Sequence, residues 1–473
     1  MLIAVPWLNP LVFGPSPEVV GCLLTCLCTI GLLELWRPQI AWAIAYAWIA
    51  AAVLSSLFGL LQYVGADVWL DPLITQARLG EAYGNLRQRN QFASLINIGF
   101  AALLCSVTRW QPKPVWREWP AWIAASILAL GNAESSSRTG LLQLALVCVM
   151  VWLWPRWWNA GTKRTMGVGI VVYALAIYLL PWLIGLDPQE HGILARLASG
   201  DAVCSSRLTL WGNVWQLIQI NPWAGWGWGE LDYAHYMVLY PGARFCDILD
   251  NAHNLPLHVA VVAGLPSAAA VLVAMGVLVC AMKPWRQSDA LVQLGWVGLT
   301  LIGLHSLLEY PLWYGPFQLA AGLCVVLIVR PQAEARWLMG RRTIAGVMLL
   351  FCIYAAWDYH RISQIYLPQE SRSPAYRDNT LAKIQGSWLF RDHVRFAELT
   401  LTAVTRENAS HMETLALDLL HFSPEPRVIE KLIEAAVLLG HDDLAKFHMV
   451  RFRAAFPDAY AKWLLSGAQV PAT

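Results

Sequence analysis

The sequence is poor in charge. Only 14% of its 473 residues are Asp, Glu, Lys or Arg, whereas an ordinary soluble domain has roughly 25%. Hydrophobic residues make up 57%, and the 26 tryptophans suit the aromatic belts at two membrane interfaces. A single water-soluble globule is therefore excluded, and we expect a membrane protein. The formal net charge of +2 also gives no electrostatic basis for a nucleic-acid partner.

Several site signatures are also missing. No Lys or Arg precedes Arg37, so we expect no basic-headed cleavable signal peptide. The chain has no CxxC, no Cys/His zinc spacing and no Asp-x-Asp, so we predict neither a metal nor a cofactor. Eight of the ten cysteines lie in apolar runs, where a thiol is a small hydrophobe. Cys204 and Cys246 lie outside those runs, and they are either a disulfide pair in an oxidising compartment or two free thiols.

Long apolar runs dominate the first 357 residues. They occur at about 17–36, 40–61, 92–107, 121–133, 140–154, 166–186, 255–281, 291–306, 317–329 and 343–357. A helix needs about 20 apolar residues to cross a bilayer, and several of these runs are shorter. We predict an all-α, polytopic bundle of about 10–12 spans.

The basic residues favour one orientation. Loops 36–39, 108–120, 155–165, 282–290 and 330–342 hold 13 Lys or Arg in 50 residues. Loops 62–91, 134–139, 187–254 and 307–316 hold 7 in 114, and all seven are Arg. The positive-inside rule places the first set in the cytoplasm. We therefore predict a bacterial inner-membrane protein whose second set of loops, including a large loop domain at 187–254, faces the periplasm with the C-terminus.

The C-terminal part differs in composition. Residues 358–473 hold 27 charged residues in 116, against 37 in residues 1–357. Apolar residues recur there at three- and four-residue spacing, which predicts helices at 381–404, 412–421, 426–439 and 442–456. We predict a membrane domain at 1–357 and a periplasmic helical domain at 358–473. Residues 435–457 resemble one tetratricopeptide repeat, and both a helical cap over the outer loops and a peptide-binding array remain open.

Polar residues gather in five segments of the predicted outer side, and the first two carry arginines. Segment 83–91 holds Arg87, Arg89 and Gln91 before the third apolar run. Arginines and amides there suit phosphates or sugar hydroxyls, and a loop solvated by headgroups is the alternative. Arg138 lies in a tight turn between two short runs. Its guanidinium matches the oxygens of a phosphate, while snorkelling to lipid headgroups is the alternative.

The third segment, 205–211, opens a predicted helix with Arg207 and is followed by a glycine-rich stretch at 225–230. This stretch lacks the preceding strand and the Lys-Ser/Thr of a nucleotide-binding loop. We interpret it as an aromatic turn at the membrane surface, suited to stacking on sugar or lipid.

Histidines mark the last two segments. His253 is followed by Asn254 at the start of the seventh run, and its ordinary pKa near 6.5 suits a general base, with a structural histidine as the alternative. His305, Glu309 and Tyr310 lie in a segment without basic residues. A buried Glu there needs a partner, and the outer arginines are the ones that we expect.

In this order the segments resemble the bacterial O-antigen ligase and O-oligosaccharyltransferase superfamily, most closely its PglL-type protein O-glycosylation ligases. The ligase pattern is His, then Asn, Ser or Gln, nine residues, Gly, two residues, and Gly, Thr or Tyr. His253, Asn254 and Gly264 meet this pattern, and Ser267 departs from it. The PglL-like marks are GNLRQRNQ at 84–91 and HSLLEYP at 305–311.

The resemblance implies transfer of a preassembled glycan from undecaprenyl diphosphate to a hydroxyl in the periplasm, without a metal. The acceptor implied is a Ser or Thr of a protein such as pilin. We predict His253 as the base, Arg138 and Arg207 as the diphosphate ligands, and Tyr310 and Glu309 as positioning groups. The further substrate-binding residues that we predict are Arg87, Arg89, Gln91, Asn254 and His305.

Three other functions remain open. An O-antigen ligase would transfer the glycan to the lipid A-core, and a polymerase of the same superfamily would extend it. A transporter of lipid-linked sugar is the alternative from a different class. It would need ionisable residues inside its spans, and these runs contain almost none.

Overall fold

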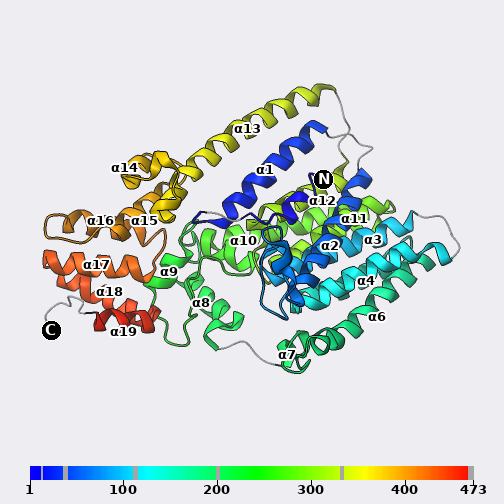
Figure 1. Cartoon of the computed structure of the whole chain (residues 1–473), viewed down its shortest axis with the longest axis horizontal. Coiled ribbons are helices and arrows are strands. Elements are labelled where there is room, and N and C mark those ends of the chain that lie inside the picture. The colour runs from blue at the N-terminus through cyan, green and yellow to red at the C-terminus, as the bar shows by residue number, and fades with distance from the viewer. Residues whose placement is uncertain (12–13, 36–40, 110–114, 199–202, 331–334, 467–473) are drawn as a thin grey trace. The chain divides into compact units, whose positions relative to one another are not determined.

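The structure is a computed structural model, and it describes residues 1–11, 14–35, 41–109, 115–198, 203–330 and 335–466. Within these ranges the regular structure is helical and contains no strand (Figure 1). The predicted all-α fold is therefore confirmed. The predicted loop 36–39 lies outside the described residues, as do parts of the predicted loops 108–120 and 330–342.

Each predicted apolar run forms a helix. The ten helices are α1 (Pro17–Leu35), α2 (Ala41–Tyr63), α3 (Arg89–Thr108), α4 (Trp119–Glu134), α5 (Arg138–Leu153), α6 (Ala160–Leu183), α10 (Leu255–Met282), α11 (Ala290–Ser306), α12 (Gly315–Val329) and α13 (Ala335–Ser363). Six of them (α1, α2, α3, α6, α10 and α13) are long and apolar enough to cross a membrane. The other four have 15 to 17 residues, short of the roughly 20 that a span needs. The chain is a multi-pass membrane protein. Six of the described helices are long enough to span the bilayer, whereas about 10–12 spans were predicted.

The chain divides into two compact units. The first unit is Met1–Gly200 with Leu278–Ile353, and the second is Asp201–Val277 with Tyr354–Thr473. This division differs from the predicted boundary at 357/358 because most of the long loop groups with the C-terminal helices.

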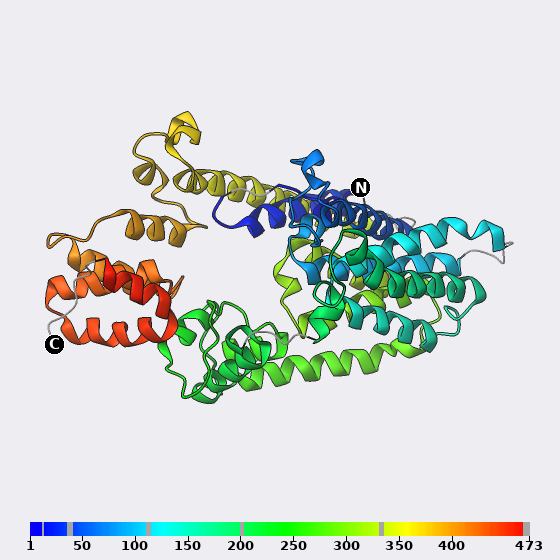
Figure 2. The same cartoon turned by 60° about the horizontal axis from the view of Figure 1, so that its bottom comes forward.

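Helix α3 is the centre of the first unit. It packs against α2, α4, α5 and α11, and these helices run side by side with α6 (Figures 1 and 2). In its apolar stretch 94% of the residues are buried, against 28% for α6. Small residues allow the close approach, since a Cβ at Gly99 would lie 2.3 Å from the Cβ of Ala52 on α2. The polar segments at the ends of α3 and its neighbours are thereby held on a rigid core.

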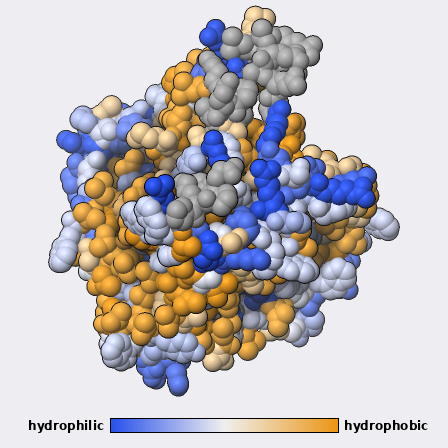
Figure 3. All heavy atoms as spheres, turned by 90° about the vertical axis from the view of Figure 1, so that its right-hand side faces the viewer, coloured by the Kyte–Doolittle hydropathy of each residue, from blue (hydrophilic) through white to orange (hydrophobic). Residues whose placement is uncertain are grey.

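Much of the remaining helix surface is apolar. Figure 3 shows hydrophobic residues over a broad part of one face of the molecule. On α6 the exposed side chains include Leu175, Tyr178, Trp182 and Leu183. An exposed apolar area of this kind is expected where a helix faces lipid.

The second unit contains two helices of the long loop and the helices of the C-terminal part. These are α8 (Arg207–Ile220) and α9 (Leu231–Met237), with α14 (Thr380–Ile384), α15 (Arg391–Leu401), α16 (Ala409–Leu419), α17 (Pro426–Leu439), α18 (Asp442–Ala455) and α19 (Pro457–Leu465). The C-terminal helices share one hydrophobic core, to which α9 contributes the buried Tyr236. The Tyr236 hydroxyl also hydrogen-bonds Nδ1 of His448 at 2.9 Å. Whether α17 and α18 act as a tetratricopeptide-like pair stays a prediction.

One detail of the C-terminal prediction is wrong. The helix predicted at 381–404 is interrupted after α14, where Gly386 has a φ of 79° that an L-residue rarely adopts. The helix predicted at 442–456 begins at Asp442 as expected. The predicted end of α17 at Gly440 is confirmed by a φ of 74°, the left-handed conformation of a helix C-cap.

Candidate functional site

Three of the predicted polar segments meet in the first unit. Asn90 Nδ2, on α3, donates to Glu309 Oε1 at 3.1 Å. Ser137 Oγ, at the N-cap of α5, donates to Asn90 Oδ1 at 2.6 Å and accepts from Gly140 N at 2.9 Å. We call Asn90, Ser137 and Glu309 the Asn90 cluster. It links segments separated by 47 and 219 positions and places Arg138, the first residue of α5, next to it.

The turn before Arg138 is unusual because it is both polar and buried. Ser135, Ser136 and Ser137 are buried, and Glu134 is 1% exposed. Neither carboxylate oxygen of Glu134 has a hydrogen-bond partner among the described residues. Gly59 makes room for it, since a Cβ there would lie 2.4 Å from Glu134 Oε1. A buried carboxyl without a partner is costly, and an ionisable group kept at such a position points to a functional role.

His305 belongs to a network of buried hydrogen bonds. Its exposed fraction is 0%, and Nδ1 lies 2.9 Å from Ser94 Oγ. Ser94 donates its only hydroxyl proton to Gln143 Oε1 at 3.0 Å, so Nδ1 of His305 is the donor to Ser94. Gln143 in turn donates to the Leu301 carbonyl at 3.0 Å. This network joins α3, α5 and α11, while the predicted substrate-binding role of His305 stays a prediction.

Two other predicted residues line a cavity of about 290 Å³. Arg87 and Gln91 face it together with Asn85, Glu18 and Tyr314. Arg87 donates to the Pro10 carbonyl at 2.6 Å, and burial lowers the pKa of its guanidinium. A partly desolvated cation in a cavity of this kind favours an anionic ligand.

Arg89 and Tyr310 are held by neighbours. Arg89 forms an ion pair of 2.6 Å with Glu81, so its charge is already matched, and no motif or spacing signals this pairing. Tyr310 stacks on Tyr314 with ring centroids 5.8 Å apart, and the ring of Trp313 lies edge-on to it at 6.4 Å. An aromatic group of this kind, with Glu309 beside it in sequence, suits the positioning of a sugar ring.

In the second unit, Arg207 is the first residue of α8, whose N-cap Ser206 accepts from Thr209 N at 3.2 Å. Two side chains tie this helix to the segment that leads to His253. Asn213 Oδ1 accepts from Phe245 N at 2.8 Å, and Trp211 Nε1 donates to the Ala252 carbonyl at 3.1 Å. Arg207 and the segment before His253 are therefore parts of one framework.

The backbone of His253 has the left-handed conformation, with a φ of 49°. Its N–H donates to Asn251 Oδ1 at 3.0 Å, and its side chain is half-buried. Asn254 caps α10, since its Oδ1 accepts from Leu257 N at 3.1 Å. Non-glycine residues with positive φ are uncommon and concentrate at functional sites. The next histidine, His258, is buried and its Nδ1 accepts from Ala252 N at 3.4 Å, which is a structural contact.

Gly264, the glycine of the ligase pattern, interrupts α10 with φ 84° and ψ 161°. The glycine-rich turn pairs with α10 at this break. Trp226 N donates to the Val261 carbonyl at 2.8 Å, and Leu265 N donates to the Pro222 carbonyl at 2.8 Å. A Cβ at Gly264 would lie 2.1 Å from the carbonyl oxygen of Trp223. The break thus fixes the aromatic turn directly on α10, while Trp223 and Trp228 stay exposed.

Asp232 on α9 is a buried carboxyl that no pattern in the sequence singled out. Burial, with a smaller contribution from the charge of Asp250, raises the pKa of Asp232 to about 7. Asp250 precedes His253 by three positions, so Asp232 interacts electrostatically with the segment that leads to the predicted base. No motif or spacing in the sequence signals this, because the perturbation arises from burial.

The thiols of Cys204 and Cys246 lie side by side. Cys246 N donates to the Cys204 carbonyl at 3.1 Å, and a hydrogen bond joins the two side chains. Both are exposed free thiols in the structure, and the bridge between them stays a prediction.

We expect these two cysteines to form a disulfide in the oxidised protein. Closing a loop of 42 positions would stabilise the fold by about 4 kcal/mol in the chain-entropy model. Peptide mapping without reduction of protein purified from membranes would show the linked peptides. If both thiols alkylate without prior reduction, the loop is held by Asn213 and Trp211 alone.

A family model described as O-antigen ligase matches residues 123–272, and one described as protein glycosylation ligase matches residues 82–104. A third, described as the C-terminal part of a virulence factor membrane-bound polymerase, matches residues 293–470. The chain resembles the O-antigen ligase and O-oligosaccharyltransferase superfamily. The resemblance predicted from the motifs is thereby confirmed, and all five polar segments fall within or overlap the matched ranges.

Two similar proteins come from Acinetobacter baylyi. A general O-oligosaccharyltransferase is 21% identical over 339 residues, which is 68% of this chain and 57% of that protein. A ComP-specific O-oligosaccharyltransferase is 25% identical over 260 residues, 53% of this chain and 45% of that protein. The chain spans about half the length of these curated relatives.

Proposed function

We propose that this ligase-like chain transfers a preassembled glycan from undecaprenyl diphosphate to a Ser or Thr hydroxyl of a periplasmic protein such as pilin. The observation that carries the proposal is His253, a left-handed residue that meets the ligase pattern at the mouth of a membrane helix broken at Gly264. The similarity to two O-oligosaccharyltransferases supports a protein acceptor.

The proposed chemistry is a displacement at the anomeric carbon. The acceptor oxygen bonds to that carbon, the bond from the carbon to the diphosphate oxygen breaks, and the diphosphate leaves with its electron pair. His253 takes the hydroxyl proton, a contribution of roughly 10²–10⁴-fold for a well-placed base. Prepositioned cations stabilise the leaving charge, and we assign this role to Arg138 and Arg207, with Arg87 at its cavity in reserve.

Tyr310 and Glu309 are assigned to positioning of the donor or the acceptor. Glu309 is itself oriented by Asn90, which Ser137 orients in turn. Because Ser137 is followed by Arg138, the Asn90 cluster would couple the position of this arginine to that of Glu309.

We expect Arg138→Lys and Arg207→Lys each to lower glycan transfer by about 10-fold or more. This is less than the roughly 10²–10³-fold loss that follows removal of a transition-state donor, because lysine keeps the charge and loses the bidentate fork. Arg156→Lys is the control, since Arg156 is exposed and donates to the Ser288 carbonyl in a loop of the other predicted side. Wild-type rates in both variants would show that these arginines only contact lipid headgroups.

We also expect excess EDTA to leave the transfer rate of the purified protein unchanged. The described residues contain no group of three His, Cys, Asp or Glu side chains placed to hold a metal, and the proposed charge stabilisation uses arginines. A rate that falls with EDTA and returns with Mg²⁺ or Mn²⁺ would contradict the arginine-only account.

Deletion of the gene distinguishes between the possible acceptors. Loss of glycan mass from intact pilin with an unchanged lipopolysaccharide ladder supports protein glycosylation. Loss of the ladder supports the O-antigen ligase that the match at 123–272 also favours, and a ladder reduced to single repeats supports the polymerase suggested by the match at 293–470.

A transporter is tested with the purified protein in detergent. There are no compartments in this preparation, so a transporter yields no product from the lipid-linked donor and an acceptor peptide. Glycosylated peptide under these conditions excludes transport as the primary activity.

A further inference from the structure

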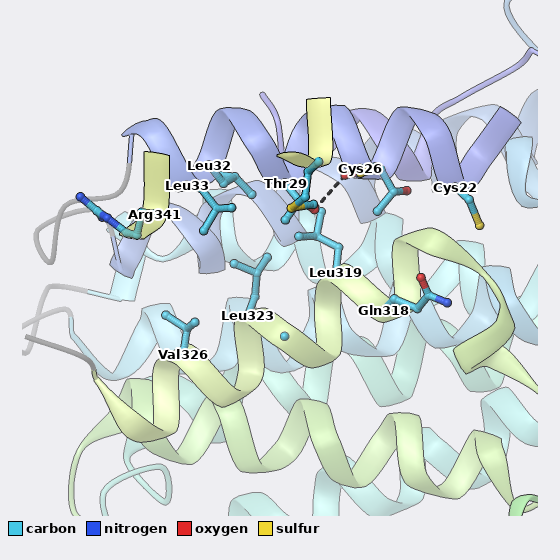
Figure 4. A pocket seen from close by; sticks show the side chains of 13 residues that line it. Cys22, Cys26, Thr29, Leu32, Leu33, Gln318, Leu319, Leu323, Val326 and Arg341 are labelled. Carbon is cyan, nitrogen blue, oxygen red and sulfur yellow. Dashed lines mark hydrogen bonds between the residues drawn. The ribbon is translucent and has the colours of Figure 1, made fainter. Parts of the chain in front are cut away.

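A groove of about 510 Å³ lies between α1, α12 and α13 in the first unit (Figure 4). Its size falls within the roughly 300–1,000 Å³ of ordinary ligand sites. Leu33, Leu319, Leu323 and Val326 face it, and Arg341 of α13 lies at one end.

The threonine hydroxyls along the groove are already satisfied. Thr25 Oγ1 donates to the Gly21 carbonyl at 2.8 Å, and Thr29 Oγ1 donates to the Thr25 carbonyl at 2.8 Å. Water needs two to four polar partners to be held in a cavity, and this lining offers few. Since α1 and α13 are long and apolar enough to cross the membrane, a hydrocarbon chain is the occupant that fits the lining.

A hydrocarbon chain offers no hydrogen-bond acceptor to the guanidinium of Arg341. Its Nε is buried and has no hydrogen-bond partner among the described residues. Two other arginines of the same predicted loop lie near carboxylates, since Arg342 lies 3.8 Å from Glu34 and Arg330 pairs with Asp289. A guanidinium that lines an apolar groove in this way is suited to the oxygens of a phosphate.

We propose that the groove holds one acyl chain of an anionic phospholipid whose phosphate is bound by Arg341. Lipid tails around the protein are as apolar as the lining, so the chain alone gives no selectivity. The contact between the phosphate and Arg341 supplies the selectivity. Arg341 belongs to the loops predicted to be cytoplasmic, where anionic lipids are attracted to basic residues. The lipid-linked donor has its glycan on the other predicted side, so this site is separate from the proposed transfer reaction and does not rest on it.

The test measures how much phosphatidylglycerol the full-length protein retains. Protein is reconstituted in nanodiscs of phosphatidylcholine with a minority of phosphatidylglycerol, transferred to detergent, and weighed by native mass spectrometry. We expect one retained phosphatidylglycerol per chain and about fivefold weaker retention in Arg341→Gln, the effect of one basic residue at an anionic lipid surface. Arg342→Gln is the matched control and retains the lipid.

A second variant fills the groove. Gly322 lines it, and a Cβ there meets no atom within 4 Å, so Gly322→Phe places its ring where the chain lies. We expect this variant to lose the lipid. Gly346→Phe is its control, because Gly346 is an exposed glycine of α13 outside the groove with equally open space. Gly322→Leu is measured in parallel, so that a misfolded phenylalanine variant leaves the test intact.

Three results would overturn the proposal. Equal loss in Arg341→Gln and Arg342→Gln would mean diffuse attraction to basic residues. Full retention in Arg341→Gln, or in both Gly322 variants, would place the lipid elsewhere. A retained species with the mass of a polyprenyl phosphate would assign the groove to the donor lipid.

Discussion

Replacement of His253 by Asn is expected to lower glycan transfer by roughly 10²–10⁴-fold, the usual contribution of a general base. The left-handed backbone of His253 dictates the choice of residue. Asn adopts this conformation more readily than most L-residues, whereas Ala would add backbone strain to the loss of the imidazole. The measurement is the single-turnover rate with a lipid-linked donor and an acceptor peptide, at matched protein levels and melting temperature.

The control for this variant is His191→Asn. His191 lies exposed in the same long loop, and we expect its replacement to leave the rate unchanged. His253→Gly adds a further readout, because free imidazole should restore part of its activity if the lost group is a base. A well-folded His253→Asn protein that transfers glycan at the wild-type rate removes His253 from the mechanism.

Gly264→Ala is expected to destabilise the protein by about 3 kcal/mol or more, and to abolish transfer through loss of the native fold. The combination of φ 84° and ψ 161° belongs to a region that is essentially restricted to glycine, with strain of order 1–3 kcal/mol for other residues. The new methyl group would also collide with the Trp223 carbonyl, 2.1 Å from the Cβ position. Thermal unfolding in detergent, followed by tryptophan fluorescence, measures the effect.

The matched control is Gly276→Ala on the same helix. A Cβ at Gly276 meets no atom within 4 Å, so alanine should be neutral or slightly stabilising there. Equal melting temperatures for the two variants would show that the break in α10 is not required. A folded Gly264→Ala protein with normal transfer would also remove the structural reason for the glycine of the ligase pattern.

Secondary structure was largely predictable. All ten apolar runs are helices, because a chain segment in lipid must satisfy its own backbone hydrogen bonds. Span counting was less reliable, since four of these helices are too short to cross a bilayer by length alone. Two glycines show the same contrast between predictable and unpredictable features. Gly440 ends α17 as predicted, whereas Gly386 breaks a helix whose apolar spacing continues through it.

The site was only partly predictable. Composition and motif singled out Arg87, Arg138, Arg207 and His253, because each is polar at the edge of an apolar run. The pairing of Arg89 was not visible in the same way, since Glu81 is eight positions away in an irregular loop. An arginine predicted to hold phosphate proved to have its charge matched within the protein.

The sequence by itself determined that this is a helical membrane protein with polar segments at the helix ends, because lipid imposes a local rule on every residue that it touches. Only the tertiary structure decided which of these segments meet. Asn90 and Glu309 are 219 positions apart, and their hydrogen bond depends on how α3 packs against α11. The contact of Gly264 with Trp223 likewise depends on two backbones approaching closely. Such contacts are fixed by the packing of whole helices, which no single stretch of sequence encodes.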